Sequence, residues 1–578
     1  MKKIHYIFSA GIIALAMNVE AQDLNKEITI DKDIVPELKE SNKIAVTPAI
    51  PSLKVKHSNL TFNDRAKTTE VKRAISQLEP ADNVDTMEIS KYRGYAMLGY
   101  FPIYNLDFSA GYQFYNNENT KLNAWVQYNG KSYDATPSSG KEMSIYDHSA
   151  TIDLSLAQRV NELSILNIEA DYGYSYFNYP WWGEECTQNA NEFNISAKWK
   201  SSIDGLKYDA TVGYNYFGFS DGVPFDKSKY VNVGSAFDAV KEHNINLKGH
   251  AMLEIEDYTS VALDLGLSIA HDNHLLIPAW GKSKGVLWHG YKNNHDYTHS
   301  ILTLTPHYDI VKDNFSLKLG ANLEYQFDIN GEMNISPDVY LDWVATDFFS
   351  AYAHFTGGVH QNTMSSIFDV SHYFMPAMAY GNSKLPYVID AGINVGPFEN
   401  ASLKVYGGYA RANDWYMPIF VEDNNHMMNE VDFSGWHLGV AASYNYKEWG
   451  KIKASYETAP QSYNEGYYMW RDRAKHVVNA SLIVTPINPL DITLDYEYRG
   501  GRCSYMQSVV STIEEVKPEY TRYSLGQVNT LSLGGLYRYN KQLSFFARVE
   551  NLFNYKYDLL YDIPSQGITG LLGLTYKF

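Results

Sequence analysis

The sequence has little cysteine and no long apolar run after its N-terminal residues. Only two cysteines, Cys186 and Cys503, occur in 578 residues, which excludes a cysteine-rich metal site. They lie more than 300 residues apart, so the sequence leaves open whether they form a disulfide or two thiols. No later stretch approaches the roughly 18 consecutive apolar residues of a membrane helix. A protein that crosses a membrane with helices is therefore excluded.

An excess of positive charge and the common catalytic motifs are also missing. The formal net charge is -18, which argues against nucleic acid as a partner. The sequence contains no P-loop, no G-x-S-x-G and no H-E-x-x-H motif. Nothing places a nucleophile, a base and an orienting acid together. We therefore expect neither an enzyme nor a bound cofactor.

The N-terminal residues have the three parts of a secretory signal peptide. Met1, Lys2 and Lys3 form a basic start, residues 7–17 form a short apolar core, and residues 19–21 (Val-Glu-Ala) fit a small-x-small cleavage site. No cysteine stands at the cleavage point, so a lipid anchor is not expected. We predict a signal peptide over residues 1–21 and an exported chain that is either soluble or a membrane β-barrel.

Aromatic residues are abundant although the chain is polar on average. There are 48 Tyr, 25 Phe and 11 Trp, and the mean hydropathy is -0.34. From residue 92 onwards many segments alternate between apolar and polar residues. In residues 315–327 the odd positions are apolar, whereas the even ones include Lys318 and Glu324. A period of two indicates strands with two different faces, and aromatic girdles favour a membrane barrel over a large soluble sheet.

The lengths of the connections support the barrel. Short turns alternate with long connections: the turns include 202–205, 312–314 and 486–489, and the long connections include 220–242, 272–297, 363–384, 412–431 and 502–526. A soluble sandwich has no reason to keep that alternation. We predict an all-β fold over residues 92–578, a transmembrane antiparallel barrel of about 22 strands with short periplasmic turns and long extracellular loops. The last strand should pair with the first, near residues 95–100, and close the barrel.

The C-terminal residues carry a family resemblance. Residues 548–558 (Arg-Val-Glu-Asn-Leu-Phe-Asn-Tyr-Lys-Tyr-Asp) resemble the V-x-N-L-F-x-x-x-Y segment near the end of TonB-dependent receptors, and residues 571–578 look like that family's last strand. The resemblance implies a 22-stranded barrel in the lipid of the outer membrane of a diderm bacterium, with an N-terminal plug. It also implies import of scarce ligands through contact with a TonB-type energising protein.

Two features depart from the family pattern. Residues 563–567 (Ile-Pro-Ser-Gln-Gly) stand where the family usually has Pro-Gly-Arg. Residues 22–91, which we interpret as an N-terminal periplasmic or lumenal segment, are too few for a complete plug. Within them, residues 27–31 (Glu-Ile-Thr-Ile-Asp) are a loose candidate for the strand that recruits the energising protein. A barrel of this width needs something to fill its lumen, and residues 22–91, infolded loops or a partner could do so.

Two functions follow from these observations. The first is a receptor barrel that binds an external ligand and admits it across the outer membrane. The alternative is a receptor-like barrel without a plug that acts as a structural subunit of an envelope assembly or transport complex, with another envelope protein as partner. The resemblance and the long external loops favour the first function, and the short N-terminal segment favours the second.

Two groups of residues are candidate sites. Trp181 and Trp182, with Trp415 and Tyr416, could form aromatic platforms for a ligand in the external loops; the alternative is a set of girdle residues at the membrane interface. Four histidines in another predicted loop could bind a transition metal together with nearby carboxylates. These are His271, His274, His289 and His295. The alternative for them is a polar external loop, because no spacing among them is diagnostic.

Overall fold

A computed structural model describes residues 92–578 apart from short gaps. The gaps are residues 103–104, 138–139, 141, 181–185, 204, 222–238, 279–290, 328–330, 375–380, 399, 422–424, 448, 460, 464–473 and 512–515. The predicted signal peptide and the segment 22–91 lie outside the described residues. In the part of the chain that is described, no helix is long and apolar enough to cross a membrane.

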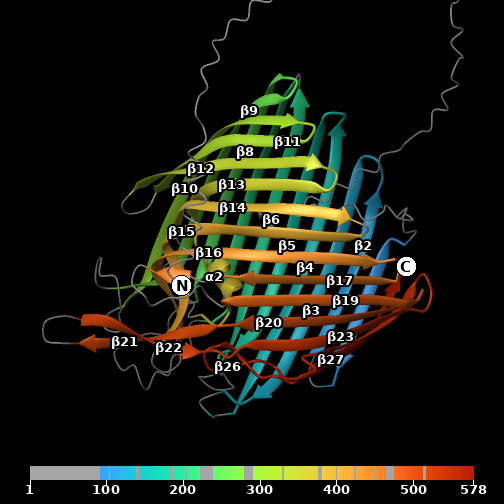
Figure 1. Cartoon of the computed structure of the whole chain (residues 1–578). Helices are drawn as coiled ribbons and strands as arrows, with labels where there is room; N and C mark the ends of the chain where they lie inside the picture. The colour runs from blue at the N-terminus through green and yellow to red at the C-terminus, as the bar shows by residue number, and fades with distance from the viewer. Residues whose placement is uncertain are drawn as a thin grey trace, which may run out of the picture. The chain divides into compact units, whose positions relative to one another are not determined.

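In the part of the chain that the structure describes, twenty-two strands form the wall of a barrel (Figure 1). Their bounds are β1 Gly94–Phe101, β2 Asn105–Asn116, β3 Thr120–Ala135, β4 Met143–Asn161, β5 Ser164–Asn178, β6 Thr187–Ile203, β7 Leu206–Phe219, β8 Lys241–Glu256, β9 Thr259–Pro278, β10 Tyr291–Lys312, β11 Phe315–Phe327, β12 Glu332–Thr346, β13 Phe349–His360, β14 Ser383–Phe398, β15 Ala401–Val421, β16 Asn425–Tyr446, β17 Gly450–Thr458, β19 His476–Ile487, β20 Leu490–Gly500, β23 Val528–Arg538, β24 Leu543–Glu550 and β27 Thr569–Lys577.

Smaller elements lie in the long connections. The short strand β18 (Gln461–Tyr463) continues the line of β17 along β16, β21 (Cys503–Ser511) and β22 (Val516–Ser524) form a hairpin, and β25 (Asp558–Leu560) pairs with β26 (Ile563–Pro564). The helix α2 spans Met364–Val370. Within the described residues the main sheet has 25 strands. β18, β21 and β22 are additions to it, and the other 22 form the wall.

The barrel closes between its first and last strands. Tyr95 is opposite Lys577 and Tyr100 is opposite Leu572 in an antiparallel register. The backbone N–H of Arg93 also donates to the carbonyl oxygen of Phe578 at 2.8 Å. The predicted fold class, the count of about 22 strands and the position of the seam are therefore confirmed.

The two faces of each strand meet different surroundings, as the alternation predicts. In β11, Leu319 and Phe327 on the outer face are nearly half exposed, whereas Asn322, Glu324 and Gln326 on the inner face are at most 5% exposed. Outward apolar side chains suit lipid, and inward polar side chains suit a lumen. Figure 1 shows the inclined strands, with the blue-green β3–β6 and the yellow-to-orange β14–β17 on different parts of the wall.

The connections are short at one end of the barrel and long at the other. Residues 162–163, 257–258 and 488–489 suffice at the short end, whereas residues 361–382 and 551–568 connect strands at the long end. By the outer-membrane pattern the short end is periplasmic. Two predicted loops are wrong, because strands extend through most of them: β15 and β16 leave only residues 422–424 between them, and β9 and β10 leave only residues 279–290.

Candidate functional site: the lumen and its extracellular mouth

The connection between β13 and β14 carries the helix α2 inward. Thr363 is the N-cap: its side-chain oxygen accepts from the backbone N–H of Ser366 at 3.1 Å, while the Ser366 hydroxyl accepts from the N–H of Thr363 at 2.9 Å. This reciprocal capping fixes where the helix begins. Met364, Ile367 and Phe368 then follow at helical spacing, so they form one apolar face.

That apolar face packs into what we call the mouth cluster. Its buried members are Phe177, Tyr179, Ala190, Phe217, Phe219, Val240, Met364, Ile367, Phe374 and Met428. Phe368 packs against it, with its ring centroid 5.1 Å from that of Phe217 and 5.8 Å from that of Phe177. The cluster joins the extracellular ends of β5 and β7 to that of β16, which lies nine strands further along the wall. The loop thus connects distant parts of the barrel mouth.

The same loop also meets the last long connection. Tyr373 packs in a second group, the loop cluster, which consists of Ala135, Met143, Ile145, Tyr373, Leu560 and Ile563. The hydroxyl of Tyr133 donates to the carbonyl oxygen of Pro564 at 3.1 Å. Residues 361–382 and 551–568 therefore support each other from two sides of the mouth.

Polar contacts fix the N-terminal end of α2 to the wall. The carboxylate of Glu242 accepts from the backbone N–H groups of Met364 and Ser365. The hydroxyl of Ser365 donates to Glu192 Oε1 at 2.8 Å. Glu242 is fully buried and Asp272 is 4% exposed, and the two side chains hydrogen bond to each other. The helix is therefore held at its first turn by acidic residues of β6 and β8.

The buried acids Glu242 and Asp272 share a proton. They are opposite each other in the register of β8 and β9, and they lie beyond the exposed apolar stretch of β8 from Ile245 to Ile255, which has the length of a membrane-spanning strand. Burial raises the pKa of Asp272 to about 9, and the neighbouring Glu242 charge adds to this effect. Burial also raises the pKa of Glu242, although the hydrogen bond from the N–H group of Met364 acts to lower it.

The far end of the loop is fixed by amide and hydroxyl groups. The Asn362 side chain donates to the carbonyl oxygen of Gly381 at 2.7 Å and to the hydroxyl of Ser383 at 2.8 Å. The N–H of Gly381 donates to the hydroxyl of Tyr416 at 2.8 Å. Asn382 donates to Gln326 at 3.0 Å. Both described ends of the connection, residues 361–374 and 381–382, are thus anchored to the wall.

The aromatic candidates lie at this mouth as far as the structure describes them. Trp415 and Tyr416 are half-buried in β15, not in a loop as expected. The Trp415 ring stacks on His360, with centroids 5.6 Å apart, and meets Phe433 edge to face. Tyr416 packs against the mouth cluster. Trp181 and Trp182 lie outside the described residues. A ligand-binding role for these four residues stays a prediction.

The four predicted metal-binding histidines are not brought together by any described contact. His271 lies on the outer face of β9, where its Nδ1 is 2.7 Å from the hydroxyl of Thr298. His274 and His295 lie in β9 and β10, but their side chains are outside the description, as is all of His289. The metal-binding role of this set stays a prediction.

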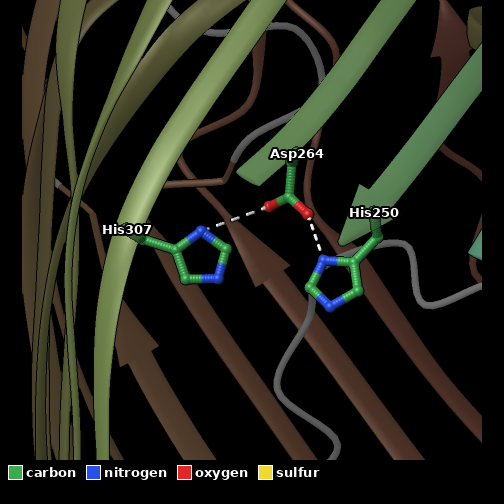
Figure 2. A group of neighbouring side chains, drawn as sticks. All are labelled: His250, Asp264 and His307. Carbon is green, nitrogen blue, oxygen red and sulfur yellow. Dashed lines mark hydrogen bonds and ion pairs between the residues drawn. The ribbon is translucent and has the colours of Figure 1, made fainter. Parts of the chain in front are cut away.

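A different set of lumen residues was missed by the sequence reasoning. Among the described residues, His250, Asp264 and His307 have ligand atoms within 4.8 Å of one another (Figure 2). They come from the neighbouring strands β8, β9 and β10. Each occupies an inward position of its alternating strand, so parity could have placed them in the lumen. Their relative height depends on the register, which the sequence does not show.

The barrel architecture is shared with solved outer-membrane receptors. A ferric enterobactin receptor mutant of Pseudomonas aeruginosa, in complex with enterobactin, matches with a TM-score of 0.63 at 12% identity, over 85% of this chain and 82% of that chain. The FrpB iron transporter of Neisseria meningitidis matches with a TM-score of 0.63 at 12% identity, over 85% of this chain and 81% of that chain. The siderophore receptor PirA of Acinetobacter baumannii matches with a TM-score of 0.62 at 10% identity, over 84% of this chain and 80% of that chain.

Comparison of the sequence gives no such match. No family model matches the chain, and no curated protein matches it. At these identities the likeness shows the fold. The chain has the 22-stranded barrel fold of the TonB-dependent outer-membrane receptors, and its apolar outer face fits it to that membrane.

Proposed function

We propose that this chain binds a ligand from outside the cell and admits it through its lumen, with residues 361–382 as the gate. The observation that carries the proposal is the docking of α2 into the mouth cluster. The helix and its flanking residues lie across the opening of the barrel, held by apolar packing, by Glu242 and by Tyr416. A wide barrel needs such an obstruction to keep the outer membrane a barrier.

The proposed ligand contact lies beside the gate. Trp415 stacks on His360, the last residue of β13, and residue 361 begins the gate. A ligand that displaces this ring pair would act directly on the start of the loop. On this proposal a TonB-type protein supplies energy through residues 22–91. The structural likeness to an iron transporter and to a siderophore receptor is consistent with a receptor role.

Conductance in planar lipid bilayers tests the gate. Three forms of the purified chain are compared: the full mature chain, a form without residues 22–91, and a form in which residues 363–380 are replaced by a Gly-Ser linker of equal length. We expect the first two to show little conductance and the third to show large, stable steps. Liposome swelling with small sugars should follow the same order.

The alternative function predicts a different pattern. A structural subunit of an envelope assembly would be recovered from native membranes with a stoichiometric partner, and the linker form would still conduct no better than the full chain. That combination would reject the gate and favour the subunit. Conductance that appears only when residues 22–91 are removed would instead assign the seal to the N-terminal segment.

A further inference from the structure

The lumen holds a group of two histidines and one aspartate well away from the mouth. His250 Nδ1 is 2.6 Å from Asp264 Oδ1, and His307 Nδ1 is 3.7 Å from Asp264 Oδ2 (Figure 2). Both rings therefore turn the same nitrogen, Nδ1, toward one carboxylate. His250 and Asp264 are directly opposite in the register of β8 and β9. The wall strands themselves hold the three groups in place.

Both nitrogens of His307 face oxygen atoms that accept hydrogen bonds. Its Nε2 is 3.2 Å from Asp309 Oδ2, and its Nδ1 is 3.3 Å from the carbonyl oxygen of Thr305 as well as 3.7 Å from Asp264. A neutral imidazole carries only one N–H. If Nε2–H donates to Asp309, the lone pair of Nδ1 points at the Thr305 and Asp264 oxygens. A cation at that point, either a second proton or a metal ion, removes the conflict.

The donor atoms suit a transition metal. Two imidazole nitrogens, one carboxylate and the nearby Thr305 carbonyl form a mixed nitrogen and oxygen set, which zinc and similar divalent ions accept. The link from His307 Nε2 to Asp309 is the kind of outer contact that orients a metal-binding imidazole. His307 is 8% exposed, so its ring is held firmly.

The surrounding charge also favours a dication. The carboxylates of Asp264 and Asp338 lie near the ammonium group of Lys318, and a third carboxylate, that of Asp309, contacts His307. Lys318 Nζ is 2.7 Å from Asp338 but 3.8 Å from Asp264, so Asp338 is its main partner. With neutral histidines the group has a net charge of -2, which one divalent ion neutralises.

We propose that His250, Asp264 and His307 bind one divalent transition-metal ion in the lumen, with Asp309 orienting His307. The site joins β8, β9 and β10 from the inside. The site shares no residue with the proposed gate, so the test of this site is independent of the test of the proposed function.

Metal titration of the tag-free, chelator-treated full chain in detergent tests the site. Zn²⁺ binding is measured by calorimetry, and the visible spectrum is recorded with Co²⁺ at neutral pH. We expect one equivalent of Zn²⁺ and absorption bands of a low-coordinate Co²⁺ complex. Asp264→Asn and His307→Gln should abolish both signals. Asp309→Asn should weaken the affinity about 10- to 100-fold, as expected for the loss of an outer contact.

His354→Ala is the matched control. His354 also faces the lumen and lies 3.4 Å from a carboxylate, that of Asp342, but the described clusters give it no second histidine ligand. This variant should bind Zn²⁺ as the unchanged protein does. Heat-modified electrophoretic mobility confirms that each variant is folded. Absence of Co²⁺ bands in the unchanged protein, or equal Zn²⁺ affinity in all variants, would overturn the proposal and leave a hydrogen-bonded network of charged side chains.

Discussion

The lumen has two regions with opposite chemistry. At the extracellular mouth, inward residues such as Phe177, Phe217 and Phe219 are apolar and buried. Toward the periplasm, the inner face carries His250, Lys318 and other charged or polar groups instead. Apolar side chains that face a wet lumen are unfavourable unless something covers them. Their position therefore marks where the infolded loop docks.

The boundary between the regions is formed by buried acids. Glu242 is inward on β8 like His250, but it accepts hydrogen bonds from the backbone of α2. It connects the apolar loop to a polar wall without leaving the first N–H groups of the helix unsatisfied. Apolar packing and one carboxylate therefore hold residues 361–374 in place, and mutation can separate these two contributions.

The largest expected effect comes from placing a charge in the mouth cluster. Ile367 is 4% exposed, so Ile367→Asp loses its apolar contacts and buries a carboxylate without a counter-charge. We expect the free energy of loop docking to fall by about 3–5 kcal/mol. Hydrogen exchange should show rapid exchange over residues 363–374, with β8–β12 unchanged.

Ile367→Leu is the control for this prediction. It keeps the apolar surface and nearly the same volume, so exchange should stay close to that of the unchanged protein. Slow exchange in Ile367→Asp would mean that the cluster does not hold the loop. The apolar character of the mouth would then not explain where the loop docks.

The wall could be predicted from the sequence because one physical rule determines it. Within the membrane, lipid on one side and a lumen on the other enforce a period of two, and residues 315–327 are the strand β11 with the bounds that the alternation indicates. Beyond the membrane neither face meets lipid, so the alternation fades while backbone pairing continues. This is why residues 412–431 read as a loop although β15 and β16 run through most of them.

The candidate site was much less accessible to sequence reasoning. The mouth cluster joins residues as far apart as Phe177, Ile367 and Met428, and no local pattern records that proximity. An inward position says that Phe177 faces the lumen but not which loop covers it. The lumen histidines have the same difficulty, since their grouping depends on the register between β8, β9 and β10.

A second, smaller effect is expected from the carboxylate at the boundary. Glu242→Ala leaves the N–H groups of Met364 and Ser365 without their acceptor in a buried position. We expect loop docking to weaken by about 2–3 kcal/mol, less than for Ile367→Asp. Exchange of the Met364 and Ser365 amides measures this. Glu242→Gln keeps an acceptor oxygen and should lose less; equal exchange in all three forms would contradict the role of Glu242.

The same carboxylate pair should make the docking of α2 depend on pH. In the docked state the pKa of Asp272 is raised from its usual value of 3.8 to about 9. The docked state therefore keeps a proton that the undocked state releases, and docking weakens as the pH rises from about 4 to about 9. Amide exchange of residues 363–374, corrected for its intrinsic pH dependence, should accelerate as the pH rises through this range and show no further change above it. Asp272→Asn should remove this change, and an unchanged pH profile in that variant would contradict the shared proton.

The smallest effect concerns Tyr416, which the sequence marked as a ligand platform and the structure places against the gate. Its hydroxyl accepts from the N–H of Gly381 at 2.8 Å, whereas its ring packs on the mouth cluster. Tyr416→Phe keeps the ring and removes only the acceptor, so docking should weaken by about 1 kcal/mol. Faster exchange of the Gly381 amide alone is the expected signature. Trp415→Ala is the contrast, because Trp415 stacks on His360 and its indole ring has a hydrogen-bond donor but no acceptor for the loop N–H groups. If Tyr416→Phe also accelerated exchange over residues 363–371, the Tyr416 hydroxyl would be a main contact that holds the loop. The apolar packing of the mouth cluster would then contribute less to loop docking than expected.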